Sequence, residues 1–257
     1  MSAATPSFLE VKSVSKVFGG LTAVKDLSMN VRRGALYGLI GPNGAGKTTV
    51  FNLLTGVYNP SEGQILLDGK RIDGKAAFQI AALGMARTFQ NIRLFTDMSV
   101  LENVMVARHL RSRQTMGDAL LGTPRHHAEE RQARERAMEL LKIFHLEHAA
   151  DEHATSLPYG SQRRLEIARA MATDPTVLLL DEPAAGMNPQ ESAALMDLIR
   201  WLRDECALTV VLVEHNMKVV MGICETVQVI DHGEAIALGT PAEIQKNADV
   251  IEAYLGG

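Results

Sequence analysis

The chain has 257 residues, a formal net charge of −4 and 46% hydrophobic residues, which fits one large α/β domain, with or without a helical insert, and argues against a mainly disordered chain. It has no long basic block, so strong nonspecific nucleic-acid binding is not indicated, and no apolar run approaches the roughly 20 residues that span a bilayer. Its two cysteines, Cys206 and Cys224, lack metal-ligand spacing and fit a reducing cytosolic compartment, and residues 1–7 lack the pattern of a secretory signal peptide.

The N-terminal region predicts a small antiparallel sheet. Residues 8–11 and 27–31 alternate apolar and polar side chains and are separated by two glycines, which is typical of strands joined by a turn. Phe18 lies just before the glycines. Its ring suits either stacking on a purine base or burial in the core at a strand end, and this residue alone does not decide between the two.

Residues 41–48 read GPNGAGKT and fit the phosphate-binding loop pattern G-x-x-x-x-G-K-[ST]. An apolar run before the loop predicts a buried strand, and the residues after it predict a helix. Gly44 and Gly46 permit the tight curl that aims backbone N–H groups inward, and the helix adds its own free N–H groups and the positive end of its dipole. We therefore expect a polyphosphate site in which Lys47 reaches the β- and γ-phosphates and Thr48 ligates Mg²⁺.

The middle of the chain is predicted to change from strands to helices. Three short elements are expected first: a strand running into a turn at 63–69, a helix at 76–83 and a strand at 86–91. Gln90, considered alone, is most simply a surface amide. From Val100 to about His148, apolar residues recur at helical spacing and opposite charges pair at i,i+4, which predicts a helical segment with a solvated face. Residues 111–127 within it are irregular and predict a mobile loop or insert.

A further helix is expected after residues 157–162. Its predicted apolar side carries Leu165, Ala168 and either Met171 or Ala172, and its predicted polar side carries Arg163, Arg164, Glu166 and Arg169. The continuous apolar run at 177–180 then predicts a strand covered on both faces, which ends in Asp181 and Glu182.

Two carboxylates at the carboxyl edge of a buried parallel strand lie where ligands bind in open α/β sheets. Burying such a pair without a function is costly. Asp181 is therefore placed to hold Mg²⁺, and Glu182 is placed to polarise water as a general base. The alternative is that the two acids form the N-cap of a following helix.

The last third of the chain predicts a helix at 190–205, a buried strand at 209–213 and a hairpin at 226–238, followed by short helices at 241–255. The buried strand ends at Glu214 and His215. A lone histidine is usually structural, but beside a phosphate loop and an acidic strand a γ-phosphate contact is the better interpretation.

These pieces occur in an order that resembles the ATP-binding-cassette (ABC) ATPase family: the phosphate loop, a glutamine after a strand, Leu-x-x-Gly-x-Gln before a helix, an Asp-Glu strand and a histidine strand. The resemblance covers nearly the whole chain. The sequences most similar to the ATP-binding subunits of branched-chain amino-acid importers lie at 86–91, 163–170, 181–189, 214–217 and 250–256.

The resemblance implies an α/β fold with a P-loop NTPase core. The core would have a mostly parallel sheet, a small N-terminal antiparallel β region and a helical subdomain. The implied single domain, 1–257, comprises a RecA-like core at about 1–90 and 165–257 and a helical subdomain at about 91–164 that includes the signature motif.

The same resemblance implies an ATPase that uses ATP and Mg²⁺ to power solute uptake beneath membrane-spanning permease subunits. Its partners would be these permeases, a second ATP-binding subunit that is the same or a homologous chain, and indirectly a solute-binding protein. No nucleic-acid partner is expected. The implied location is the cytoplasmic face of the inner membrane, as a peripheral subunit.

By position, the resemblance also implies roles for individual residues. Adenine would stack on Phe18, and the phosphates and Mg²⁺ would be held by Asn43, Gly44, Ala45, Gly46, Lys47, Thr48 and Thr49. Gln90 would sense the metal and the attacking water, Asp181 would support Mg²⁺ with Thr48 and Gln90, Glu182 would be the base and His215 would touch the γ-phosphate. The signature would reach the nucleotide on the opposite subunit through Tyr159, Gly160, Ser161 and Gln162.

Two positions depart from the family pattern. The commonest signature has Ser-Gly-Gly-Gln after the leucine, whereas residues 158–161 read Pro-Tyr-Gly-Ser. Pro158 offers neither a hydroxyl nor an N–H donor, although Gly160 and the following helix N-terminus can still meet a phosphate. We therefore expect one of three outcomes for the contact between the signature and the nucleotide on the opposite subunit. The contact is weaker, it depends on Ser161, or the paired subunit provides the better signature. Asn188 stands where many relatives carry Asp, which suits the branched-chain importer pattern.

Three alternative functions are open. An ABC-type ATPase of DNA repair or translation usually carries a coiled-coil insert or two cassettes, and neither is evident here. An importer ATPase for urea or amides has the same motifs, because selectivity resides in other subunits. A P-loop kinase or GTPase is disfavoured by the Asp181–Glu182 pair and by His215.

Overall fold

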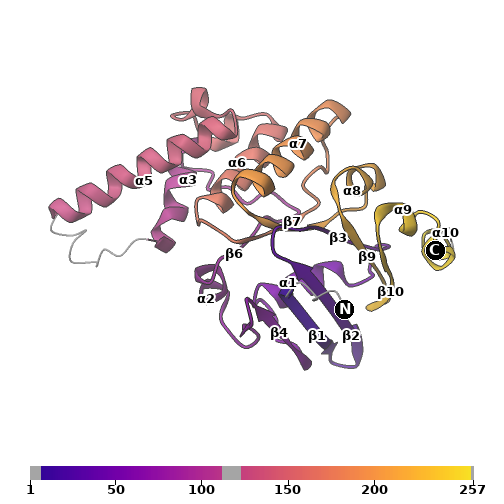
Figure 1. The fold of residues 1–257 in the computed structure, drawn as a ribbon. Helices are drawn as coiled ribbons and strands as arrows, with labels where there is room; N and C mark the ends of the chain where they lie inside the picture. The colour runs from indigo at the N-terminus through magenta and orange to yellow at the C-terminus, as the bar shows by residue number, and fades with distance from the viewer. Residues whose placement is uncertain (1–6, 112–122, 256–257) are drawn as a thin grey trace.

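The computed structural model describes residues 7–111 and 123–255 (Figure 1). Its centre is a six-stranded sheet in the order β10-β9-β3-β8-β7-β6, in which every neighbouring pair is parallel except β9 with β10. The strands are β3 (Leu36–Ile40), β6 (Met85–Arg87), β7 (Val177–Asp181), β8 (Thr209–Val213), β9 (Thr226–Asp231) and β10 (Glu234–Gly239). The mostly parallel sheet that the sequence predicted is therefore present.

A second, four-stranded antiparallel sheet has the order β2-β1-β4-β5. Its strands are β1 (Ser7–Phe18), β2 (Leu21–Arg32), β4 (Glu62–Leu67) and β5 (Lys70–Arg71). β1 and β2 pair antiparallel from Ser7 with Arg32 to Phe18 with Leu21, so the two glycines form the hairpin turn as predicted. Figure 1 shows this sheet below the six-stranded one.

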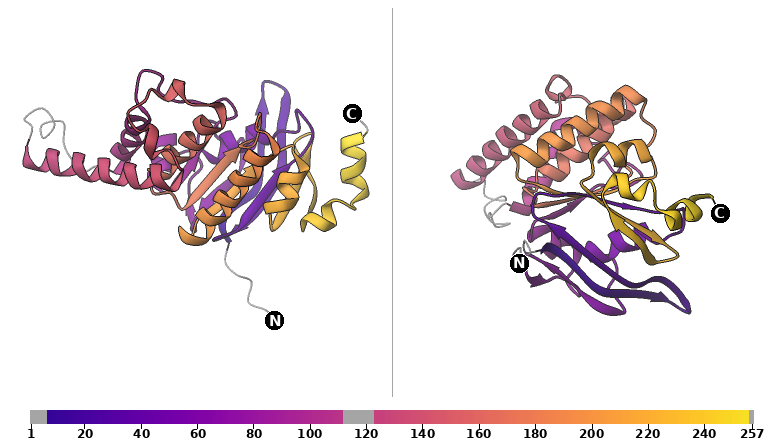
Figure 2. Two further views of the ribbon diagram at one scale, coloured as in Figure 1. Left: turned by 90° about the horizontal axis from the view of Figure 1, so that it is seen from above. Right: turned by 45° about the vertical axis from the view of Figure 1, so that its right-hand side comes forward.

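The helices lie on both sides of the six-stranded sheet. They are α1 (Lys47–Leu54), α2 (Ala77–Ala82), α3 (Val100–Arg108), α5 (Pro124–Ile143), α6 (Tyr159–Met171), α7 (Pro189–Glu205), α8 (Met217–Ile223), α9 (Pro241–Ile244) and α10 (Ala248–Leu255). Short 3-10 helices occur at His109–Arg111, Glu147–Ala149 and Ala154–Ser156. Figure 2 shows α5 projecting away from the sheets and α10 at the opposite end of the molecule.

The six-stranded sheet separates two hydrophobic cores, because successive side chains of a strand point to opposite faces. In β7, Leu178 and Leu180 pack with the helices α3, α5, α6, α7 and α8. Val177 and Leu179 instead pack with α1 and the antiparallel sheet. The strand is buried along its whole length, which explains why its sequence is continuously apolar and fixes its acidic end at the sheet edge.

Three sequence predictions differ from the structure. Residues 124–127 were predicted to be a mobile loop, but they begin α5, because the Thr123 side chain caps the amide of His126 and a proline follows the cap. Most of the rest of that predicted loop, 112–122, lies outside the described residues. The strand predicted at 86–91 ends at Arg87.

The third difference concerns α6, which begins at Tyr159, inside the predicted signature, rather than after Gln162. Arg163 and Glu166, predicted on its polar face, are 0% and 1% exposed. α6 also crosses the boundary that the sequence predicted at 164/165. Within the described ranges, no helix has the length and apolar character that crossing a bilayer requires.

Candidate nucleotide site

The phosphate loop joins β3, a fully buried strand, to α1. Gly46 has a φ of 103°, and a Cβ there would lie 2.6 Å from the carbonyl oxygen of Ala23, so only glycine fits. No side chain caps the N-terminus of α1. The first-turn N–H groups of this helix therefore remain available to an anion, as a phosphate site requires.

Lys47 is folded back over its own loop. Its Nζ donates to the carbonyl oxygens of Gly41 at 2.7 Å and Pro42 at 2.8 Å, and the residue is only 7% exposed. Burial lowers the pKa of Lys47, while Glu182 and Asp181 act in the opposite direction. The ammonium is thus hydrogen-bonded to two loop carbonyls, and a phosphate oxygen could replace either carbonyl as its partner.

Asp181 is held at the end of β7 by a buried ion pair. Its Oδ2 lies 2.8 Å from Nη2 of Arg87, and both side chains are at most 6% exposed. Arg87 also donates to Oδ1 of Asn52 at 2.7 Å, so the guanidinium links β6, β7 and α1. The next helix, α7, is capped by Asn188, so the alternative of an acidic N-cap at Asp181 and Glu182 is wrong.

Two polar side chains from neighbouring segments contact the carboxylate of Glu182. Nε2 of Gln90 donates to its Oε2 at 3.1 Å, and Nδ1 of His215 lies 3.4 Å from the same oxygen. Glu182 has a φ of 46°, which is uncommon for a residue with a side chain, and its N–H donates to the carbonyl of Val213 on β8. The structure thus brings together three residues that the sequence placed separately, in the segments that follow β6, β7 and β8.

Oxygen ligands suited to Mg²⁺ are present at the same edge. The Thr48 hydroxyl, the Asp181 carboxylate and the Gln90 amide oxygen are the hard donors that this ion prefers. Thr48 and Gln90 are exposed, whereas Asp181 is 3% exposed and paired with Arg87. The chemistry of the donor set therefore fits Mg²⁺.

Glu214 is a buried carboxylate that sequence reasoning did not assign. Its Oε1 accepts the N–H of Ala184 at 3.0 Å and its Oε2 accepts the N–H of Asn216 at 3.3 Å. Burial raises the pKa of Glu214, and these two hydrogen bonds partly oppose the increase. The side chain thereby ties the segment after Glu182 to the segment that carries His215.

The signature residues form the first turn of α6. Pro158 is the N-cap residue and supplies no side-chain hydrogen bond, as its lack of a hydroxyl predicts. Nη2 of Arg164 donates to Oγ of Ser161 at 3.0 Å, and Gln162 donates to the carbonyl of Leu157. Across the described ranges, no hydrogen bond or ion pair joins Tyr159, Gly160, Ser161 or Gln162 to the phosphate loop of the same chain.

Phe18 lies at the end of β1 and is 39% exposed. The alternative that its ring is buried in the core is therefore wrong. The Phe18 ring meets that of Tyr58 edge-on, with 5.0 Å between centroids, and Nζ of Lys16 lies 4.9 Å from its centroid. The exposed ring remains compatible with base stacking. At the other end of the chain, burial raises the pKa of Tyr254 on α10, and the backbone of Gly41 partly opposes this increase.

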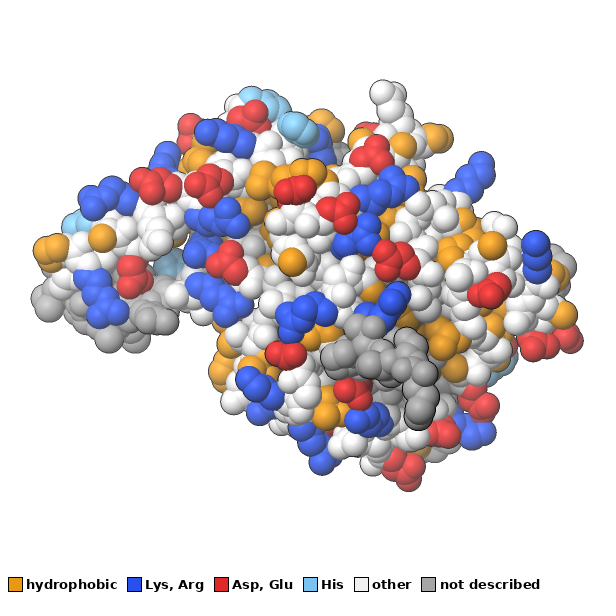
Figure 3. Space-filling model, viewed as in Figure 1, with side chains coloured by type: hydrophobic (Ala, Val, Ile, Leu, Met, Phe, Trp, Pro, Cys, Tyr) orange, Lys and Arg blue, Asp and Glu red, His pale blue; other side chains and the backbone are white. Residues whose placement is uncertain are grey.

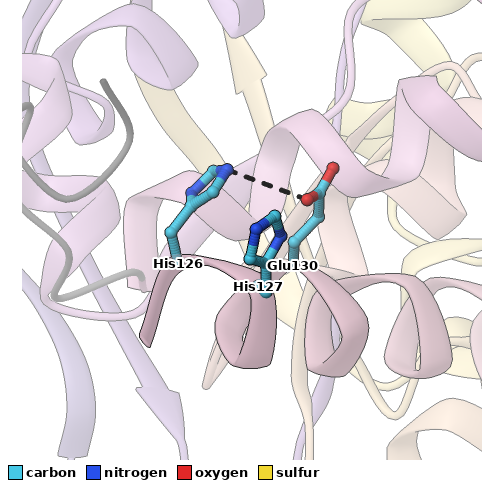
Figure 4. A group of neighbouring side chains, drawn as sticks. All are labelled: His126, His127 and Glu130. Carbon is cyan, nitrogen blue, oxygen red and sulfur yellow. Dashed lines mark ion pairs between the residues drawn. The ribbon is translucent and has the colours of Figure 1, made fainter. Parts of the chain in front are cut away.

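Two further surface features lie outside this site. His126, His127 and Glu130 group near the start of α5 (Figure 4), with Nε2 of His126 3.8 Å from Oε2 of Glu130. This contact is an ion pair when the imidazole is protonated. On the face drawn in Figure 3, acidic and basic side chains are interspersed, in keeping with the small net charge.

The fold and the site define a class. A phosphate loop between a buried parallel strand and a helix, opposite carboxylates at the end of a nearby parallel strand, is the arrangement of a P-loop nucleoside-triphosphate hydrolase.

Comparison with known proteins narrows that class to one family. Residues 24–185 match the ABC transporter family, and residues 236–257 match a family described as branched-chain amino acid ATP-binding cassette transporter. The chain is 48% identical to the high-affinity branched-chain amino acid transport ATP-binding protein LivG of Salmonella typhimurium and 49% identical to BraF of Pseudomonas aeruginosa, over 96% of this chain and 97% of each relative. The chain belongs to the ATP-binding cassette ATPases of the ABC transporter family.

Solved structures agree. The ADP conformation of MJ1267, an ATP-binding cassette of an ABC transporter, matches with a TM-score of 0.85 and 28% identity over 98% of this chain and 99% of that one. A dimeric post-hydrolysis structure of the cassette MJ0796, bound to ADP and Pi, matches with a TM-score of 0.77 and 26% identity over 91% and 98%. The predicted family, fold class and ATPase activity class are therefore confirmed.

Proposed function

We propose that this chain is the ATP-hydrolysing subunit of an importer for branched-chain or related amino acids. The observation that carries the proposal is the convergence of Gln90 and His215 on Oε2 of Glu182. The similarity to LivG and BraF over nearly the whole chain, and the match at 236–257, support the choice of solute class.

In the proposed reaction, the backbone amides at residues 43–49 bind the phosphates of ATP, and Lys47 exchanges its loop carbonyls for phosphate oxygens. Glu182 accepts a proton from the attacking water. Gln90 orients that water beside the carboxylate, and His215 contacts the γ-phosphate. The water oxygen bonds to the γ-phosphorus as the bond from that phosphorus to the β–γ bridging oxygen breaks, and ADP and inorganic phosphate are the products. Lys47 and His215 donate hydrogen bonds to phosphate oxygens, which stabilises the negative charge that shifts toward the leaving group.

Mg²⁺ would be held by Thr48, Gln90 and Asp181, and when bound it would neutralise charge on the β- and γ-phosphates. Adenine would stack on the exposed ring of Phe18. The Asp181 side chain is already fixed by Arg87, so the protein orients this carboxylate through its own contacts.

The proposal includes a second ATP-binding subunit, either another copy or a homologous chain. Tyr159, Gly160, Ser161 and Gln162 would face the nucleotide held by that subunit, and closure of the pair on ATP would work the permease subunits at the cytoplasmic face of the inner membrane. Differential affinity for ATP in the open and closed pairs supplies the coupling. A solute-binding protein would deliver the solute to the permeases.

Purification of the intact membrane complex tests the proposal. Its ATP turnover is measured with candidate solute-binding proteins, each with and without its solute, and the Glu182→Gln complex serves as the inactive control. Stimulation by a protein loaded with leucine, isoleucine or valine is expected. Stimulation only by a urea- or amide-loaded protein would change the solute class, and recovery of an ATPase without permeases would contradict the transport assignment.

A further inference from the structure

Arg163 and Glu166 form an ion pair inside the protein, on adjacent turns of α6. Nη1 of Arg163 lies 3.0 Å from Oε2 of Glu166, and the two side chains are 0% and 1% exposed. Burial raises the pKa of Glu166, and the adjacent guanidinium partly opposes this effect. Burying charged groups this deeply costs free energy unless their remaining donors and acceptors also form hydrogen bonds. The other hydrogen-bond partners of the two side chains therefore identify the part of the protein that the pair stabilises.

Those partners are the backbone of the segment that carries Gln90. Arg163 donates to the carbonyl oxygen of Phe89 at 2.6 Å and to that of Gln90 at 2.8 Å. Oε1 of Glu166 accepts the N–H of Phe89 at 3.2 Å and that of Arg93 at 3.5 Å. The pair therefore forms hydrogen bonds with both backbone carbonyl and backbone N–H groups of residues 89–93, a segment that belongs to no helix or strand.

These hydrogen bonds connect two parts of the nucleotide site. On one side, the Gln90 side chain donates to Glu182. On the other side, Nη2 of Arg163 donates to the hydroxyl of Tyr159 in the first turn of α6 at 3.2 Å. A Cβ at Gly186 would lie 3.1 Å from the Tyr159 ring, so this ring also packs closely on the segment that follows Glu182.

The pair is not arranged as a simple stabilising contact. Nε of Arg163 is buried without a hydrogen-bond partner, which costs free energy. A well-packed apolar pair in the same volume is often as stable as a buried ion pair or more so. What an apolar pair cannot do is hold the carbonyl and amide groups of residues 89–93 in one orientation relative to α6.

We propose that Arg163 and Glu166 are positioning residues for ATP hydrolysis, which fix residues 89–93 to the signature helix so that the Gln90 amide meets Glu182 only when α6 is correctly placed. This inference rests on the proposed function of Gln90 and Glu182. Both side chains are buried, and their hydrogen bonds go to each other, to the backbone of residues 89–93 and to Tyr159. The pair acts through Gln90, so its loss lowers the turnover number and leaves the affinity of the phosphate loop for ATP nearly unchanged.

A double-mutant cycle tests this, with Glu166→Gln and Gln90→Ala made singly and together in the assembled complex. Glu166→Gln keeps the shape but removes the charge that holds Arg163 and two backbone amides. We expect a fall in kcat of about tenfold or more, a KM for ATP within about twofold, and little further loss when Gln90 is already alanine, because residues that act as a unit are non-additive. Arg163→Lys should lower kcat less than Arg163→Ala, since it keeps one charged donor.

Arg108→Gln is the matched control. Arg108 is largely buried and joins α3 to the other end of α6 through the carbonyl of Ala172 and the carboxylate of Asp174, without touching residues 89–93. It should lower the unfolding temperature and leave kcat within about twofold. The inference is overturned if Glu166→Gln leaves kcat unchanged, or if its effect multiplies fully with that of Gln90→Ala. A wild-type complex that fails to hydrolyse ATP, or an active Glu182→Gln complex, would instead overturn the proposed function.

Discussion

The amide of Gln90 and the carboxylate of Glu182 lie 3.1 Å apart, although 92 positions separate them in the chain. They meet because β6 and β7 are neighbouring parallel strands, so the segments that follow both strands leave the sheet at the same edge. A proton acceptor and a group that can orient water are thereby placed side by side.

Substitution of Glu182 tests its role as the base. Glu182→Gln keeps the volume and the contact with Gln90 but removes the proton acceptor. We expect ATP to bind and the subunits to pair, while kcat falls by about 10²–10⁴-fold, the usual contribution of general base catalysis. Single-turnover hydrolysis of radiolabelled ATP measures the effect, and wild-type turnover by this variant would remove Glu182 from the mechanism.

Lys47→Ala should weaken nucleotide binding. A charge-assisted hydrogen bond contributes about 1.5–3 kcal/mol, so the Kd for ATP should rise by about 10–100-fold. Titration of a fluorescent ATP analogue measures it. Lys25→Ala is a suitable control, because Lys25 forms an ion pair with Glu234 in which both side chains are more than half exposed. Equal affinities for the Lys47→Ala and control proteins would contradict the phosphate-loop assignment.

Local patterns in the sequence were sufficient for most of the fold. The strand at 209–213 was predicted with its observed ends, because a fully buried parallel strand leaves a continuous apolar run. The phosphate loop was predicted because its glycine spacing is required by backbone geometry. Such features depend on neighbours in the chain, so they can be read without knowledge of tertiary contacts.

The buried charges could not be predicted in the same way. Arg163 and Glu166 were placed on a polar face of α6, because helical periodicity assigns charged residues to solvent. Their partners lie at Phe89, Gln90 and Arg93, which only the tertiary fold brings near. Arg87 was missed for the same reason, since its partner Asp181 is 94 positions away.

Asn188 supplies a test of helix capping. Its side chain accepts the N–H of Glu191 at 2.9 Å, and the Glu191 carboxylate accepts the N–H of Asn188 at 3.0 Å. Asn188→Ala should lower the free energy of unfolding by about 1 kcal/mol, which lowers Tm by about 2–4 °C in a protein of this size. Asn188→Asp should preserve stability, because both side chains cap well. Equal melting temperatures for all three proteins would contradict the capping role.

The two cysteines should differ in reactivity. Burial raises the pKa of Cys224 to about 12, whereas Cys206 is exposed and its thiol pKa is also raised by partial burial. The thiolate is the reactive form and appears only as pH rises toward the pKa, so at pH 8 about one in 10⁴ Cys224 thiols is ionised. Iodoacetamide should label Cys206 alone in folded protein and both residues in urea. Mass spectrometry identifies the site, and early labelling of Cys224 in the folded protein would contradict its burial.

The ion pair between Arg87 and Asp181 should show a strong stability coupling. Arg87→Gln leaves the Asp181 carboxylate buried without its cation, and the loss of one partner of a buried pair costs about 3–5 kcal/mol. Asp181→Asn likewise leaves the Arg87 guanidinium buried without its anion. The contacts of this guanidinium with Asn52 and with the rings of Phe51 and Phe89 reduce the loss of stability.

The double variant should then be more stable than the sum of the single losses predicts, because neither uncompensated charge remains buried. Urea unfolding without nucleotide or Mg²⁺ measures the three free energies, so the result does not depend on any role of Asp181 in metal binding. Additive losses would mean that the two side chains do not compensate each other in the folded protein. A measurable coupling would establish that Arg87 stabilises the carboxylate from which the acidic edge of the site is built.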